Sequence, residues 1–219
     1  MMRICAIALA AISLSCRPGA AADETVPDGG LLVFQDDFER AEIGPGWRDT
    51  SRGAYTIVDG ELRARGARNH PLWLQRALPR DARIEFTARS LGPAVDIKAE
   101  AFGDGRSHAR RASYTATSYV VILGGWNNTR SVIARLDEHG ADRRVRERPR
   151  PDIGRRYSFV IERRGRALRW FLDGELFLGF EDPSPLAGPG HEFFAFNNWE
   201  SEVLFDDLAI YDVGGGRAQ

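Results

Sequence analysis

Two short clusters in this chain combine tryptophan with paired asparagines, Trp126-Asn127-Asn128 and Asn197-Asn198-Trp199. A pyranose ring presents a flat apolar C–H face and a ring of hydroxyl groups. An indole can stack on that face, and side-chain amides can both donate hydrogen bonds to the hydroxyls and accept them. The alternative is that the tryptophans pack in the core and the asparagines hold left-handed turn positions. Because the pattern occurs twice, we expect both clusters to bind carbohydrate.

A second set of candidates alternates along a predicted strand over residues 95–102. Asp96, Lys98 and Glu100 share one face of it, because strand side chains alternate between faces. Lys98 is the only lysine in the chain, and its compact ammonium has a tunable pKa. If this strand pairs with the preceding strand over residues 83–89, Glu85 lies beside them. The four side chains are therefore catalytic candidates, although paired charges on an exposed sheet face are also common.

Glycoside hydrolysis requires two carboxyl groups, roughly 5–5.5 Å apart for retention of configuration and about 6.5–9.5 Å apart for inversion. Asp96 and Glu100 are four residues apart, so about 13 Å separates their Cα atoms at a rise of about 3.3 Å per residue. Their side chains would have to lean together to act as a pair. Glu85 with either of them across neighbouring strands is the easier geometry.

Histidines and further polar residues extend the candidate binding set. His139 follows Arg135 at a predicted strand end, and Trp73 lies near His70. An imidazole can donate to a sugar hydroxyl or act as a base near neutral pH. A polysaccharide lyase needs such a base and a group that neutralises a uronate, for which Asn127 or Arg135 would serve. No spacing of histidine, cysteine and aspartate predicts a zinc site.

The elements that must position these residues are strands. Apolar and polar residues alternate with period two along most of the chain, bounded by Gly, Pro, Asn and Asp,. Asp59-Gly60 and Asp173-Gly174 specify hairpins,. Thirteen short strands favour an all-β jelly-roll sandwich of two antiparallel sheets. We expect strands at 31–38, 55–58, 61–65, 72–77, 83–89, 95–102, 119–123, 131–136, 157–163, 168–172, 176–180, 192–196 and 203–211.

With the strands placed, the motifs of residues 29–213 resemble those of concanavalin A-like lectin/glucanase domains. The motifs are Phe34-Gln35-Asp36-Asp37-Phe38 with Trp47, Leu168-Arg169-Trp170-Phe171-Leu172-Asp173-Gly174, and Val203-Leu204-Phe205-Asp206-Asp207. Their order is most similar to the 3-keto-disaccharide hydrolase-like and family 16 glycoside hydrolase-like domains of exported bacterial proteins.

This resemblance implies a ligand-binding concave sheet face and a carbohydrate partner, either a glycan or a disaccharide. The family 16 pattern places its nucleophile two residues before the position of Asp96, where this chain has Ala94. The family 16 mechanism is therefore not carried over. Related sandwiches also hold a structural Ca²⁺, for which Asp36, Asp37, Asp206 and Asp207 are candidates; capping of turns and edges by aspartate is the alternative. We expect no other cofactor.

The N-terminus is typical of an export signal, with Arg3 followed by a short apolar run over residues 4–14,. Ser13-Leu14-Ser15-Cys16 resembles the bacterial lipoprotein box, in which the cysteine is lipidated; cleavage after Ala22 is the alternative. We expect a signal and the start of a tether over residues 1–22, a flexible tether over 23–30, the sandwich over 31–213 and a disordered tail over 214–219.

The formal net charge of −1 gives no overall attraction to nucleic acid, and the predicted membrane contact is through the lipid anchor only,. Eleven arginines and three acids lie in residues 143–169, and ten acids with no arginine or lysine lie in 173–212. We expect an exported, lipid-anchored, monomeric carbohydrate-binding domain of the cell envelope. A glycoside hydrolase or polysaccharide lyase, and a structural envelope protein without a small ligand, remain alternatives.

Overall fold

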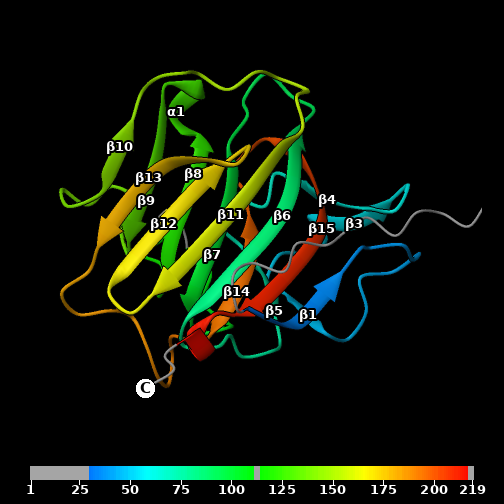
Figure 1. Cartoon of the computed structure of the whole chain (residues 1–219). Coiled ribbons are helices and arrows are strands. Elements are labelled where there is room, and N and C mark those ends of the chain that lie inside the picture. The colour runs from blue at the N-terminus through cyan, green and yellow to red at the C-terminus, as the bar shows by residue number, and fades with distance from the viewer. Residues whose placement is uncertain (1–29, 111–113, 217–219) are drawn as a thin grey trace, which may run out of the picture.

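The computed structural model describes residues 30–110 and 114–216, which form two antiparallel sheets stacked face to face (Figure 1). The larger sheet has the strand order β13 (Glu175–Glu181), β12 (Ala167–Leu172), β11 (Tyr157–Arg164), β6 (Ala82–Ser90), β15 (Glu202–Asp212), β4 (Glu61–Arg65) and β3 (Tyr55–Val58), and β1 (Leu31–Asp36) also pairs with β15. The smaller sheet has the order β10 (Arg144–Arg146), β9 (Arg130–Arg135), β8 (Tyr119–Gly124), β7 (Ile97–Gly103), β14 (Phe193–Asn197), β5 (Leu72–Leu74) and β2 (Trp47–Asp49). The prediction of an all-β sandwich is confirmed.

The hydrophobic core lies between the two sheets and is rich in phenylalanine. Phe196 of the smaller sheet packs on Phe205 of the larger one with ring centroids 4.3 Å apart, and Phe86 stacks on Phe159 at 4.8 Å. Such aromatic pairs add to the free energy of apolar burial. Because side chains point alternately to the two faces of a strand, every second side chain of the smaller sheet lies on its outer face, where the polar residues of β7 are found,.

The strands that carry Glu85 and Asp96 do not pair, so the condition for placing Glu85 beside Asp96, Lys98 and Glu100 is not met. Glu85 lies on β6, whose neighbours are β11 and β15 of the larger sheet. Asp96 immediately precedes β7, which pairs with β8 and β14 of the smaller sheet. Consecutive strands here cross from one sheet to the other, and alternation alone does not identify a strand's partner. Glu85 instead forms an ion pair with Arg83 on its own strand.

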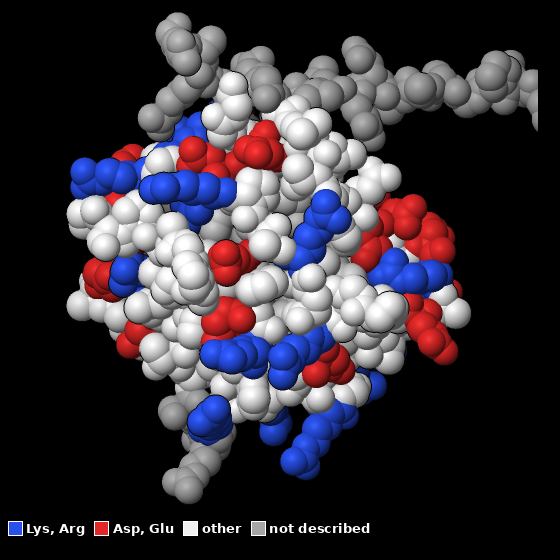
Figure 2. Space-filling model, turned by 90° about the horizontal axis from the view of Figure 1, so that it is seen from below, with Lys and Arg blue, Asp and Glu red and all other residues white. Residues whose placement is uncertain are grey.

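The basic stretch and the acidic stretch of the sequence meet in space. Arg155 lies 2.6 Å from Asp173, and Arg156 lies 3.6 Å from Asp206. On the face seen from below in Figure 2, basic and acidic side chains are interspersed. Ion pairs across strands therefore join the two stretches and offset part of the uneven charge of the linear sequence,.

The N-terminal predictions, including lipidation of Cys16, fall on residues 1–29, which lie outside the described residues. At the other end, Gly214–Gly216 form a short 3-10 turn. Within the described part of the chain, no helix is long and apolar enough to cross a membrane.

Candidate functional site

A cavity of about 590 Å³ opens on the outer face of the smaller sheet, and we call it the tryptophan pocket. Strand β7 forms its floor, and its walls come from the turn after β8, the loop after β9, the loop after β14 and the segment before β5. Six side chains predicted from the sequence line it: Asp96, Lys98, Trp126, Asn127, His139 and Trp199. The fold therefore brings residues from both tryptophan clusters and the β7 segment to one place.

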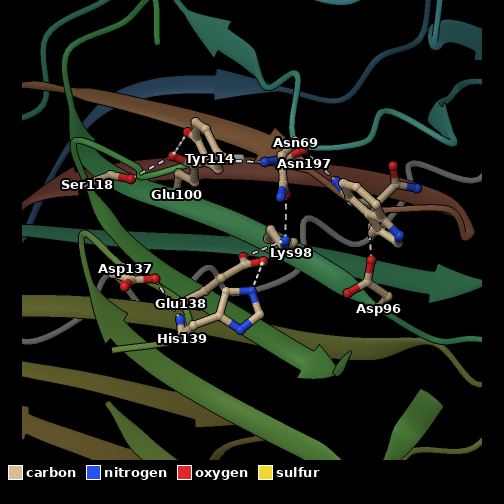
Figure 3. A network of polar contacts seen from close by, with 12 residues as sticks. Asn69, Asp96, Lys98, Glu100, Tyr114, Ser118, Asp137, Glu138, His139 and Asn197 are labelled. Carbon is tan, nitrogen blue, oxygen red and sulfur yellow. Dashed lines mark hydrogen bonds and ion pairs between the residues drawn. The ribbon is translucent and has the colours of Figure 1, made fainter. Parts of the chain in front are cut away.

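Lys98 lies at the floor of the pocket and is only 1% exposed. Its Nζ donates to Asn69 Oδ1 at 2.7 Å and to Glu138 Oε2 at 2.7 Å, as Figure 3 shows. Burial by itself would lower the pKa of Lys98, but the nearby carboxylates of Asp96 and Glu138 outweigh that effect and raise it,. The floor of the pocket therefore carries a fixed positive charge among carboxylates.

Glu100 lies behind the pocket and not in its lining. Its carboxylate accepts hydrogen bonds from the Tyr114 hydroxyl at 2.8 and 2.9 Å, the Ser118 hydroxyl at 2.6 Å and the Asn197 amide at 2.8 Å (Figure 3). Burial raises the pKa of Glu100, and these three donors oppose the rise. Both carboxylate oxygens of Glu100 already accept hydrogen bonds, so this residue is placed to position Tyr114 and Asn197. The sequence predicted instead that Glu100 is a catalytic group, which would contact the ligand directly.

Asp96 has a free carboxyl oxygen at the pocket. Its Oδ2 accepts the backbone N–H of Trp199 at 2.5 Å, and among the described residues no hydrogen bond reaches its Oδ1. Burial raises the pKa of Asp96, and the ammonium of Lys98 opposes the rise,. This side chain can therefore accept from a ligand hydroxyl when ionised and donate to a ligand oxygen when protonated.

Trp126 and Asn127 lie in α1 (Gly125–Asn128), a short turn in which both residues have left-handed backbone angles, with φ of 51° and 55°. The Asn128 side chain fixes the turn, because its Oδ1 accepts from Val95 N at 2.7 Å and its Nδ2 donates to Pro93 O at 2.8 Å. The indole of Trp126 packs edge-on against His139 with centroids 5.5 Å apart. Asn128 therefore has the turn-holding role that the sequence left open, while Trp126 and Asn127 line the pocket.

Unfavourable backbone geometry concentrates around this cavity. Asn69, Asp96, Trp126 and Asn127 are four of the twelve described non-glycine residues with positive φ, and all four line the pocket. Left-handed angles cost an ordinary residue roughly 1–2 kcal/mol. Such strain gathers where the surrounding structure holds side chains for function.

Trp199 forms the opposite wall and is 44% exposed. The neighbouring Asn198 is buried; its Oδ1 accepts from Ala67 N at 2.8 Å and its Nδ2 donates to Ser201 O at 2.7 Å. Asn198 thus holds the loop that presents Trp199. An exposed tryptophan ring therefore lies at the edge of this cavity.

Five predicted binding residues do not line the pocket: Asn128, Asn197 and Asn198, which have the partners given above, and also Trp73 and Arg135. Trp73 is completely buried, and its indole N–H donates to Ser107 O at 2.9 Å beneath the loop that follows β7. Arg135 donates to Asp182 at 2.9 Å and to Ser184 O at 3.2 Å. Both side chains have structural partners, because packing and ion pairing compete with ligand binding for the same residue types.

Eight residues of the pocket lining were absent from the predicted set, and five of them are polar: Asn69, Tyr114, Glu138, Glu200 and Ser201. Glu138 precedes His139 at the end of a predicted strand, so its position next to a candidate was a usable signal. Asn69 and Tyr114 lie in irregular segments far from β7 in the sequence, and nothing in their local pattern predicts contact with it.

The aspartates proposed for calcium have other partners in this arrangement. Asp36 accepts from Trp47 Nε1 at 2.8 Å and from Arg40 NH2 at 2.8 Å, so a guanidinium already serves as its counter-ion. Among the described residues, no group of three or more His, Cys, Asp or Glu side chains could hold a metal ion. These residues do not fit a calcium site as they stand, and calcium binding stays an untested prediction.

The chain matches no known protein-family model. Over 165 residues, or 74% of its length, it is 28% identical to an extracellular exo-alpha-L-arabinofuranosidase of Streptomyces chartreusis. That match covers 18% of the relative, so the chain spans less than a fifth of that enzyme's length.

Solved structures with a similar fold include the carbohydrate-binding module CBM66 from Bacillus subtilis. That match has a TM-score of 0.56 and 13% identity, and it covers 76% of this chain and 96% of the module. The laminarinase catalytic domain from Thermotoga maritima matches with a TM-score of 0.57 and 14% identity, covering 84% of this chain and 98% of that domain. The described chain is a concanavalin A-like jelly-roll sandwich.

Proposed function

We propose that this protein binds carbohydrate in the tryptophan pocket. The observation that carries the proposal is the placement of Trp126 and Trp199 in one cavity whose floor is polar. Indole rings offer stacking surfaces for the C–H face of a sugar, and the floor offers groups for its hydroxyls. The volume of about 590 Å³ lies within the usual range for small-ligand sites, about 300–1,000 Å³,.

The polar groups of the pocket suit a ligand with many hydroxyls. Asp96 Oδ1 accepts, the amide of Asn127 both donates and accepts, and His139 lies exposed at the rim,. The carboxylates of Asp96, Glu138 and Glu200 outnumber the single ammonium of Lys98 in this lining. The pocket therefore favours a neutral sugar over an anionic one.

Two of the similar proteins support the same conclusion through their names, since one is a carbohydrate-binding module and another is an arabinofuranosidase. A structural envelope protein that binds no small ligand would have no need of an exposed tryptophan opposite a strained turn. The name of the second relative, which includes "extracellular", also supports export of this chain.

Binding is tested with a panel of neutral oligosaccharides by titration calorimetry. Trp199→Ala and Asp96→Asn should each weaken the interaction with any sugar that the wild type binds, while Leu176→Ala, an exposed apolar change on β13 of the other sheet, should leave it unchanged. Wild-type affinity in both pocket variants would overturn the proposal.

Glycoside hydrolysis is the second candidate, and the presence of two carboxyl groups in the lining of one cavity favours it. Asp96 and Glu138 both line the tryptophan pocket, and Glu138 accepts a hydrogen bond from the ammonium of Lys98. Glycoside hydrolysis requires a pair of carboxyl groups at the scissile bond. Release of reducing ends by the wild type that is lost in Glu138→Gln, with binding retained, would select the enzyme.

A further inference from the structure

A second cavity, of about 800 Å³, lies beside the tryptophan pocket, and we call it the arginine cavity. It is formed by the loop over residues 50–54, the segment over 65–70 and the segment over 108–110. Its titratable lining consists of Arg52, Arg65, Arg68, His70, His108 and Arg110. Among the described residues that line it there is no aspartate or glutamate.

The arginines of this cavity are available to a ligand. Within the described structure, Arg52 and Arg110 have no ion-pair partner. Arg68 lies 3.1 Å from Glu200 and Arg65 lies 3.7 Å from Glu202, and both guanidinium groups are largely exposed. Exposed pairs of this kind contribute only about 0–1 kcal/mol, so an anionic ligand can compete with those carboxylates.

The two histidines form an ordered part of the cavity wall. Their rings stack with centroids 5.5 Å apart and an interplanar angle of 28°. His70 Nδ1 lies 3.0 Å from Ala67 O and 3.1 Å from Arg68 O, and His108 Nδ1 lies 3.2 Å from Arg106 O. Because a carbonyl oxygen only accepts, Nδ1 is the protonated nitrogen in each ring, and each Nε2 has no hydrogen-bond partner among the described residues.

We propose that the arginine cavity binds the oxyanion groups, sulfate or carboxylate, of an acidic glycan. Guanidinium groups recognise planar carboxylates and tetrahedral sulfates by paired, charge-assisted hydrogen bonds. The neighbouring tryptophan pocket carries an excess of carboxylates, so an anionic substituent is repelled there and attracted here,. A glycan that spans both cavities would therefore place its neutral part in the tryptophan pocket and its anionic groups in the arginine cavity.

The position of the arginine cavity favours a glycan over a nucleic acid. Arg68 and His70 line the arginine cavity, while Asn69 between them lines the tryptophan pocket. Glu200, the partner of Arg68, also lines the tryptophan pocket. A saccharide with one residue in the tryptophan pocket would pass over this shared segment. This assignment to a glycan rests on the proposed function, whereas oxyanion binding itself does not.

The test compares sulfated dextran oligosaccharides and oligogalacturonates with unmodified dextran of the same length, by calorimetry at low ionic strength. The Arg52→Gln/Arg110→Gln double variant should weaken binding of the sulfated or carboxylated probe at least tenfold. The matched control is Arg80→Gln/Arg169→Gln, which removes the same charge from two exposed arginines outside both cavities. Equal weakening in both double variants would show that the effect depends only on the change in net charge, and it would overturn the proposed site.

Two further measurements separate this proposal from the proposed function. Inorganic sulfate, followed by NMR shifts of the His70 and His108 rings, should bind the wild type and Trp199→Ala equally and bind the double arginine variant less tightly. Loss of sulfate shifts in Trp199→Ala would contradict an independent anion site. A single-stranded oligodeoxynucleotide of matched charge that binds more tightly than sulfated dextran, and whose binding depends on the same two arginines, would overturn the assignment to a glycan.

Discussion

The ammonium of Lys98 lies 2.7 Å from Oε2 of Glu138 and ties the centre of β7 to the loop that follows β9. Both side chains are largely buried, and Asn69 supplies a second acceptor for the same ammonium. Three segments that are distant in the sequence, namely β7, the loop after β9 and the segment before β5, therefore meet at the Lys98 ammonium. Because the pocket forms around this junction, we expect its loss to affect both the stability of the fold and the proposed binding of a ligand.

Removing only one member of this junction should be costly. Lys98→Met leaves the Glu138 carboxylate without its counter-ion, and breaking a buried pair in this way typically costs about 3–5 kcal/mol. The free energy of unfolding in urea measures the effect. The Lys98→Met/Glu138→Gln double variant should recover part of the loss, since the carboxylate that was hydrogen-bonded to Lys98 is removed together with it. Arg68→Gln, which breaks an exposed pair, should change stability by less than about 1 kcal/mol,.

Trp73 and Trp199 should respond in opposite ways to the same substitution. Trp73→Ala empties a fully buried site and should cost about 3–5 kcal/mol of folding stability,. Trp199→Ala removes a side chain that is almost half exposed, so the thermal midpoint should stay nearly unchanged while sugar binding weakens by about 1–3 kcal/mol,. Melting curves and one titration for each variant are sufficient. A large drop in the melting temperature of Trp199→Ala would show that its ring is structural.

The sequence predicted the local structure well where a signal spans only a few residues. Asp59-Gly60 joins β3 to β4 and Asp173-Gly174 joins β12 to β13, and all four residues have the positive φ that such hairpin turns require,. Pairing between distant strands was not predictable in the same way. β6 pairs with β15 from the far end of the chain, and only three-dimensional packing selects that partner,.

The same contrast between local signals and long-range packing applies to the candidate site. Alternation placed Lys98 and Glu100 on one face correctly, because side-chain direction in a strand is a local property,. It could not show that Glu100 would be covered, since Tyr114 and Ser118 cover it from a segment that follows β7. The paired asparagines have both of the roles that the sequence allowed: Asn127 lines the pocket, and Asn198 holds a loop.

Glu100 should make the fold less stable as the pH rises. Burial raises its pKa above the ordinary value of 4.5, so its stabilising contribution is complete below about pH 4.5 and is lost as the pH rises through the raised pKa,. Glu100→Gln cannot ionise, and its stability should therefore fall less between about pH 4 and 7 than that of the wild type. Unfolding free energies across this range test the difference. Parallel curves for the two proteins would mean that folding does not raise the pKa of Glu100.

The N-terminal prediction is tested in cells. If Cys16 is lipidated, the protein should partition into a detergent-extractable membrane fraction, and Cys16→Ser should release or misprocess it. Several acyl chains are needed for firm retention, because one chain holds a protein only reversibly. A mature N-terminus at Asp23, determined by mass spectrometry, would instead establish cleavage after Ala22.

Asn127 permits separation of backbone geometry from ligand contact. Its φ of 55° lies in the left-handed region, which glycine adopts without strain and alanine adopts at a cost of roughly 1–2 kcal/mol,. Asn127→Ala should therefore lower stability by about 1 kcal/mol, whereas Asn127→Gly should leave it nearly unchanged. Both variants remove the amide from the wall of the tryptophan pocket, so both should weaken sugar binding if that amide contacts the ligand. Weakened binding in Asn127→Ala together with full affinity in Asn127→Gly would show instead that the residue serves only to shape the turn that presents Trp126.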